Sequence, residues 1–338
     1  MKKLLLFYGI LTCLFLAFLY QFYFREELQN DRAHQEAALQ GQIDERYVMV
    51  TFQSGIDYWK NGLKGFEDAA ETLNVSVEYR GATQYDVNEQ ITVLEQVIAR
   101  KPSGIALSAI DPDALVAAID KAVHEGIPVV LFDSGAPASK AYSFLGTDNY
   151  NAGVTAAHQM AKLIGRRGKV AVITQPNQLN HKERTAGFRE TIDSEYPDIS
   201  VAAVEDGKGD QMVSEKAASG LLERYPDLVG VFATEANGGV GVSHAVKSVG
   251  KLGQVRILGF DTDKGTLDMV KEGTISATLA QGTWNMGYWS LMYLFHLKHG
   301  IVQPNADLRD NKVPPLPTYV DTGISIVTEL NADDYFAK

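Results

Sequence analysis

From Val48 onward, short apolar runs rich in valine and isoleucine alternate with longer segments whose apolar residues recur every three to four positions. This alternation predicts parallel strands joined by right-handed helical crossovers, with helices on both faces of the sheet. The runs that predict strands are 48–52, 75–79, 104–109, 127–133, 169–175, 199–205, 228–234, 255–261 and 275–281. The pattern breaks near Thr147 and then resumes, and it contains too many units for one compact sheet. We therefore expect an α/β protein of two doubly wound lobes.

Helix boundaries support this interpretation in the first half of the chain. Asp86 precedes an amphipathic segment at 86–100, and Glu89 stands three residues later, as in a capping box. The segment 111–126 opens on Asp111-Pro112 and closes on a glycine. Both segments are predicted to be helices between strands.

The N-terminus carries a different pattern. Lys2-Lys3 precedes the run Leu4–Phe24, which is apolar except for Thr12 and Gln21. At about 1.5 Å per residue this run spans a bilayer core of roughly 30 Å. We expect an uncleaved single-pass anchor with the body on the extracytoplasmic side. A lipoprotein modified at Cys13 and a cleaved signal peptide are the alternatives.

The segment 25–46 is polar, rich in helix-forming residues and free of proline, and it predicts a helical stalk. The whole chain of 338 residues has a formal net charge of -11, which argues against a nucleic-acid partner because phosphate binding requires clustered lysine and arginine. Its single cysteine forms no intrachain disulfide and no cysteine metal site.

Polar side chains follow almost every predicted strand. In an open parallel sheet, ligands bind beyond the carboxyl ends of the strands. Some of these residues are poor helix caps, so capping explains only part of the pattern. The poor caps are Gln53, Gln175, Glu235 and Gln281. The sequence therefore predicts a polar cleft at the carboxyl ends of the strands.

The body of the chain resembles the periplasmic sugar-binding proteins of the ribose and galactose type. The resemblance rests on landmarks in a fixed order: "DYWKNGLKGFEDAAETLNV", "ALSAIDPDAL", "VVLFDSGAP", "FLGTDNYNAG", "HKERTAGF", "VFATEANGGVGV", "ILGFDTDKG" and "SATLAQGTWNMG". It implies two lobes that are joined by three crossovers and close on a sugar. The crossovers are expected near Thr147, Gln281 and Asn311. The implied division is an anchor at 1–24, a stalk at 25–46, an N-terminal lobe at 47–148 plus 282–311, and a C-terminal lobe at 149–281 plus 312–338.

The resemblance also implies roles for single residues. Tyr58 and Trp59 match paired aromatics that stack on the sugar ring, and Asp133 matches an acceptor for sugar hydroxyls. Arg184 matches an arginine that points into the cleft. Asn149 begins the helix after the first crossover.

Four further positions complete the implied site. Asp261 and Gln281 match a second carboxylate and an amide in the hinge region. Glu235 stands where asparagine or aspartate is frequent, so either Glu235 or Asn237 fills that role. Ser134 follows Asp133 where related sugar binders have arginine, which counts against ribose as the ligand.

The residues themselves fit a neutral sugar, because carboxylates accept hydrogen bonds, arginine donates them, and amides do both. Simpler interpretations remain open. Asp133 and Asp261 are also plausible helix caps, Tyr58 and Trp59 plausible core aromatics, and "HKER" a solvated run. His181 is expected to be a loop residue.

The predicted function is that of a membrane-anchored extracytoplasmic protein that binds a monosaccharide, a pentose such as xylose being favoured. It is predicted to close on its sugar and to signal to a membrane partner such as a sensor histidine kinase. The alternative is the substrate-binding component of a sugar ABC transporter, with a permease as partner. No cofactor and no metal are expected.

Two other classes of function fit the sequence poorly. No nucleophile elbow, metal-ligand cluster or phosphate loop indicates an enzyme, although two cleft carboxylates leave a glycosidase as a formal alternative. A sugar-responsive repressor needs an N-terminal helix-turn-helix, and the apolar run occupies that place.

Overall fold

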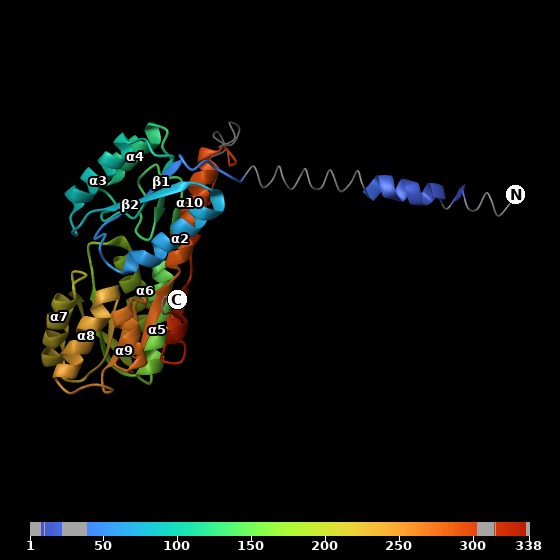
Figure 1. The fold of residues 1–338 in the computed structure, drawn as a ribbon. Helices are drawn as coiled ribbons and strands as arrows, with labels where there is room; N and C mark the ends of the chain where they lie inside the picture. The colour runs from blue at the N-terminus through green and yellow to red at the C-terminus, as the bar shows by residue number, and fades with distance from the viewer. Residues whose placement is uncertain (1–7, 10, 22–38, 303–313, 315, 336–338) are drawn as a thin grey trace.

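Two six-stranded sheets, each covered by helices on both faces, organise the chain into two lobes (Figure 1). The computed structural model describes residues 8–9, 11–21, 39–302, 314 and 316–335. The two sheets have equivalent strand orders, β11-β5-β4-β3-β1-β2 and β12-β10-β9-β8-β6-β7. The two doubly wound α/β lobes expected from the alternating pattern are confirmed.

The first lobe contains a sheet in which all strand pairs are parallel. Its strands are β1 (Arg46–Thr51), β2 (Ser76–Gly81), β3 (Gly104–Leu107), β4 (Val129–Phe132), β5 (Phe144–Gly146) and β11 (Tyr319–Asp321). Its helices are α2 (Tyr58–Leu73), α3 (Val87–Ala99), α4 (Val116–His124) and α10 (Thr283–Lys298). Helices α2 and α10 pack together on one face, and α3 and α4 lie on the other (Figure 1).

The second lobe repeats this plan. Its strands are β6 (Gly168–Thr174), β7 (Ile199–Asp206), β8 (Leu228–Ala233), β9 (Arg256–Phe260), β10 (Ala277–Gln281) and β12 (Ile324–Val327). Its helices are α5 (Asn149–Leu163), α6 (Leu179–Glu195), α7 (Gln211–Arg224), α8 (Ala236–Ser248) and α9 (Lys264–Lys271), followed by the 3-10 turn η1 (Ala332–Tyr335). All its strand pairs are parallel except β10 with β12.

The strand order reverses at one point in each sheet. Strand β1 lies between β2 and β3, and β6 lies between β7 and β8, with parallel pairing on both sides. The helices that follow the central strand and its neighbour then leave on opposite faces, which opens a crevice at the carboxyl ends of the strands. Each lobe therefore contributes one crevice to the region where the lobes meet.

Three crossovers connect the lobes, as expected. The first follows β5 at 147–148 and the second follows β10 at Gly282, close to the predicted positions. The third lies at 322–323 instead of near Asn311, because β11 still belongs to the first sheet and pairs in parallel with β5. Strand β11 has three residues, too few to show an alternating pattern. The residue Asn311 itself lies outside the described residues.

The N-terminal predictions are only partly covered by the described residues. The predicted anchor Leu4–Phe24 lies partly outside them; within it, residues 11–21 are helical. Among the described residues, no helix has both the length and the apolar character to cross a membrane.

The prediction of a helical stalk over 25–46 is wrong for the part of this segment that the structure describes. Residues 25–38 lie outside the described residues, and 39–45 form turns before β1 starts at Arg46. The amide N–H of Gly41 donates to the carbonyl oxygen of Leu73 at 2.8 Å, which docks this segment on the end of α2.

The two predicted helix starts have different outcomes. Asp86 caps α3 by accepting from the N–H of Glu89 at 2.8 Å, but the Glu89 carboxylate accepts from Thr83 and Gln84 instead of returning to the cap. Helix α4 starts only at Val116, because the side chain of Asp111 accepts from two following N–H groups and holds a turn there.

Glycines allow the helix pairs to approach closely. A Cβ atom at Gly153 of α5 would lie 2.1 Å from the carbonyl oxygen of Arg184 on α6, and one at Gly187 would lie 2.1 Å from that of Tyr150. Because any side chain would force these helices apart, both glycines fix the position of the α6 turn that carries Arg184.

Candidate ligand-binding site

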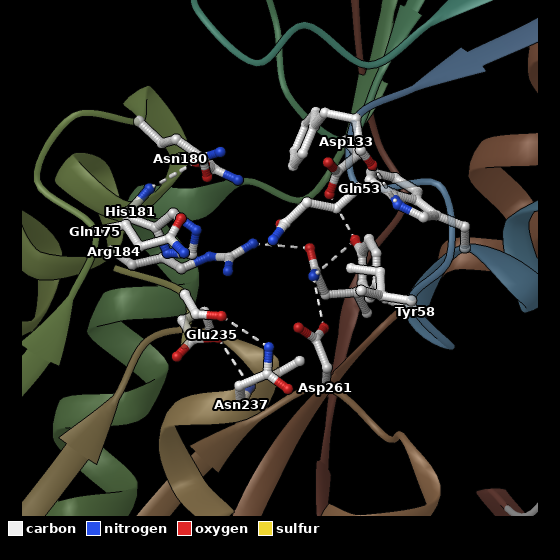
Figure 2. Close-up of a pocket in the computed structure, with 17 residues that line it drawn as sticks. Gln53, Tyr58, Asp133, Gln175, Asn180, His181, Arg184, Glu235, Asn237 and Asp261 are labelled. Atoms are coloured by element: carbon white, nitrogen blue, oxygen red, sulfur yellow. Dashed lines mark hydrogen bonds between the residues drawn. The ribbon is translucent and has the colours of Figure 1, made fainter. Parts of the chain in front are cut away.

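A pocket lies between the lobes, at the carboxyl ends of strands from both sheets. Figure 2 shows polar side chains converging on it from both sides. Its lining residues are Phe52, Gln53, Ile56, Tyr58, Trp59, Asp133, Gln175, Gln178, Asn180, His181, Arg184, Gly209, Glu235, Ala236, Asn237, Asp261 and Gln281. Of the nine predicted ligand-binding residues, all except Asn149 line this pocket.

Three of the residues that follow strands have left-handed backbone conformations. The φ angles are 43° at Gln53, 59° at Asp133 and 68° at Asp261. The backbone N–H of Asp133 donates to Leu145, and that of Asp261 donates to Leu279, so both turns are fixed by the neighbouring strand. Positive φ angles in residues other than glycine are uncommon and concentrate at functional sites. This conformation turns both carboxylates into the pocket (Figure 2).

Arg184 is the largest fully buried side chain of the described residues, with 1% of its surface exposed. Its Nε donates to the side chain of Asn149 at 2.9 Å, and Nη1 donates to the carbonyl oxygen of Thr234 at 2.8 Å. Its guanidinium lies 3.8 Å from the ring centroid of Phe260. Burial lowers the pKa of Arg184, and the nearby carboxylates, Asp261 foremost, counteract that shift. Asn149 therefore positions Arg184 instead of lining the pocket.

Gln281 lies between Arg184 and the carboxylate of Asp261. Among the described residues, no ion pair joins Arg184 to an acidic side chain. Nη2 of Arg184 donates instead to Oε1 of Gln281 at 2.9 Å, and Nε2 of Gln281 donates to Oδ1 of Asp261 at 2.7 Å. An amide inserts between cation and carboxylate because it accepts from one and donates to the other.

Gln281 also connects the two lobes. Its Oε1 accepts a second hydrogen bond from Thr147 in the first crossover at 2.7 Å, and its Nε2 donates to the hydroxyl of Tyr58 at 3.1 Å. Since Gln281 is the last residue of β10 and directly precedes the second crossover, its side chain links both hinge segments to the pocket.

Tyr58 and Asp133 form the wall from the first lobe. The Tyr58 hydroxyl donates to Oδ1 of Asp133 at 2.5 Å, and Ser108 donates to Oδ2 at 2.9 Å. Burial raises the pKa of Asp133, while these two donors and the charge of Arg184 act in the opposite direction. The predicted role of Asp133 as a buried acceptor is consistent with this geometry.

Trp59 has a different environment from the one implied for it. Only 3% of it is exposed, its indole N–H donates to the carbonyl oxygen of Phe52 at 2.8 Å, and its ring packs edge-on against Phe52 and Phe132. Trp59 is therefore a core aromatic that supports the pocket wall. Tyr58 occupies the exposed side of the pair.

Glu235 combines a cap with a pocket position. Its Oε2 accepts from the N–H of Asn237 at 2.8 Å at the start of α8, while its buried Oε1 has no protein partner. Burial raises the pKa of Glu235 to about 7. The side chain of Asn237 donates to the carbonyl oxygen of Gly209 at 2.9 Å. Glu235 thus offers a free oxygen to a ligand, whereas the amide of Asn237 already has a partner.

The sequence did not identify several pocket residues. Gln53 and Gln175 were recognised as polar strand ends without an assigned role, and Gln178 and Asn180 were not recognised. His181 was expected in a loop and lies on α6, buried, with Nδ1 3.0 Å from the hydroxyl oxygen of Thr234. Burial and the charge of Arg184 lower the pKa of His181 well below its usual value, so the ring is neutral.

The arrangement provides many hydrogen-bond donors and acceptors beside an aromatic hydroxyl, with one cation and three buried carboxyl groups: Asp133, Glu235 and Asp261. Such a set suits a small neutral molecule that carries several hydroxyls. Within the described ranges, no group of acidic, histidine and cysteine side chains has the geometry to hold a metal ion.

Comparison with known proteins gives a consistent result. A sequence model described as "periplasmic binding protein domain" matches residues 47–300. A ribose import binding protein of Bacillus subtilis is 29% identical over 219 residues, which cover 64% of this chain and 70% of the relative.

Two solved structures are much more similar. An arabinose-binding protein from Geobacillus stearothermophilus is 66% identical with a TM-score of 0.79, and covers 87% of this chain and 100% of its own. A sugar ABC transporter sugar-binding protein from Bacillus halodurans is 65% identical with a TM-score of 0.82, and covers 86% of this chain and 100% of its own.

Substitution Glu235→Gln should change how stability depends on pH. Burial raises the pKa of Glu235 from 4.5 to about 7. The stabilisation of the folded state that follows from this raised pKa is fully present below pH 4.5 and is lost as pH rises to about 7. The unfolding free energy of the ligand-free parent relative to the variant should fall by up to about 3 kcal/mol across this window. Urea unfolding at pH 4.5 to 8 measures it. For the exposed control Glu223→Gln, the curve of unfolding free energy against pH should run parallel to that of the parent. A parallel curve for Glu235→Gln would contradict the raised pKa of Glu235.

Proposed function

The chain belongs to the periplasmic binding protein family, and we propose that it binds a pentose, with arabinose as the first candidate, in the pocket between its two lobes. Like the relatives that it matches, the chain is a sugar-binding protein and not an enzyme. The observation that carries the choice of sugar is the 66% identity to a protein described as arabinose-binding. The described relatives also include binders of ribose, allose, apiose and xylose, so the proposal concerns a monosaccharide with many hydroxyls.

The pocket chemistry supports this proposal. Sugar hydroxyls both donate and accept, and the pocket provides acceptors in Asp133, Asp261 and Glu235 and a donor in Arg184. Two of these carboxyl groups come from different lobes: Asp133 follows β4 of the first lobe, and Asp261 follows β9 of the second. A ring held between them contacts both lobes, and it therefore favours the closed arrangement through its differential affinity for the two states.

The similarity to transport proteins favours an ABC permease as the membrane partner. A ribose import binding protein and a sugar-binding protein of a sugar ABC transporter are among these similar proteins. The prediction of signalling to a sensor histidine kinase gains no support from these comparisons, so delivery of sugar to a permease is the better supported function. The apolar run Leu4–Phe24 remains our proposal for the membrane attachment.

Substitutions Asp261→Ala and Arg184→Ala should each weaken arabinose binding by about 30-fold, or roughly 2 kcal/mol, because each leaves a buried charged or polar group without its partner. Titration calorimetry at neutral pH measures the dissociation constants, and thermal unfolding confirms that both variants are folded. The control Asp268→Ala removes an exposed carboxylate of α9 and should bind as the parent does. Parent-like affinity in both pocket variants would place the sugar site elsewhere.

Delivery to a permease predicts a second result. Deleting the gene should abolish uptake of the labelled sugar, and full-length protein recovered from membranes in the presence of sugar should carry permease subunits, because closure on the ligand changes the surface shown to a partner. The same pull-down without sugar is the control. Recovery of a sensor kinase together with unchanged uptake would contradict transport and establish signalling instead.

A further inference from the structure

A second cavity adjoins the sugar pocket on the side of the hinge. We call it the hinge-side cavity, and both lobes line it. Its lining residues are Leu131, Asp133, Gly135, Ala136, Pro137, Ser139, Ala141, Ser143, Phe144, Asn149, Leu179, Asn180, Glu183, Thr318 and Tyr319. Its volume of about 440 Å³ falls within the range of small-molecule sites.

The two cavities share one part of their walls. Asp133 of the first lobe and Asn180 at the start of α6 line both. Figure 2 shows these two side chains on opposite sides of the upper part of the sugar pocket. A molecule bound in the sugar pocket therefore has the hinge-side cavity as its neighbour beyond Asp133 and Asn180.

The lining of the hinge-side cavity suits a ring-shaped group. Phe144 and Tyr319 lie 5.6 Å apart with their rings tilted by 35°, and 48% of Tyr319 is exposed. The Phe144 ring is fixed against the backbone, because a Cβ atom at Gly146 would lie 2.5 Å from it. Aromatic faces of this kind cover apolar ring surfaces of a ligand.

The polar groups of the cavity are carboxyl groups, hydroxyls and amides, so it offers both acceptors and neutral donors. Asp133 and Glu183 supply carboxyl oxygens, and no lysine, arginine or histidine is among the described lining residues. Burial and the neighbouring Asp148 raise the pKa of Glu183. Carboxyl, hydroxyl and amide groups beside aromatic faces suit a ring that carries hydroxyls or an aromatic substituent.

We propose that the hinge-side cavity is a second subsite, and that the protein binds pentose glycosides with the pentose in the sugar pocket and its ring-shaped substituent against Phe144 and Tyr319. This inference rests on the proposed function, since it assigns the pentose to the sugar pocket. The substrate class then includes disaccharides and aryl glycosides as well as the free sugar.

The test compares a free sugar with a substituted one on the full-length chain. The probes are L-arabinose and the two anomers of 4-nitrophenyl L-arabinopyranoside, measured by titration calorimetry. At least one anomer should bind within about threefold of free arabinose, because its aromatic ring gains the contacts of the second subsite. Two variants address the cavity alone: Tyr319→Ala removes one aromatic face, and Ala141→Trp fills the space.

Both variants should weaken binding of the glycoside by about tenfold and change binding of free arabinose by less than about twofold. The control Tyr150→Ala removes an exposed aromatic of α5 that lines neither cavity and should change neither affinity. Binding of arabinose without either glycoside, or a glycoside affinity that neither variant changes, would overturn the subsite and leave the proposed function intact. Failure of free arabinose to bind would instead overturn arabinose as the sugar of the proposed function, and the arabinoside subsite with it.

Discussion

The rest of the site depends on the hydrogen bonds of the Gln281 side-chain amide. It accepts hydrogen bonds from Arg184 and Thr147 and donates to Asp261 and Tyr58. An isolated buried guanidinium is strongly unfavourable, and three neutral oxygen acceptors together with one aromatic ring hold Arg184 in place without a direct ion pair. Because Gln281 directly precedes a crossover, any rotation of one lobe against the other acts on this network.

The equivalent topology of the lobes explains how two carboxylates come to face one cleft. In each lobe a strand ends in a left-handed aspartate whose N–H is bonded to the neighbouring strand, Asp133 after β4 and Asp261 after β9. Burial raises the pKa of both carboxyl groups, to about 7 for Asp261, because their charged forms are costly in a buried site. Hydroxyls of a ligand stabilise the charged forms of such groups by donating to them, and this is the basis on which we propose that a sugar bound by both aspartates favours lobe closure.

Features of the protein that follow a regular residue pattern were predictable from the sequence, and features that depend on local geometry were not. The alternating segments predicted both sheets, and polar strand ends such as Asp261 predicted the cleft. Strand β11 is too short for any periodicity, so the third crossover was misplaced. The division between Tyr58 and Trp59 depends on the rotation of α2. Asn180 and His181 enter the pocket from the first turn of α6, whose start has no side-chain cap and so no sequence signature.

The most direct test of the central claim is a crystal structure of the protein with L-arabinose. The account predicts one sugar ring in the cleft between Asp133 and Asp261, with hydroxyls within hydrogen-bond distance of Arg184 and of Oε1 of Glu235, the buried oxygen that has no protein partner. A ring bound elsewhere on the molecule, or an empty cleft at saturating sugar, would contradict it.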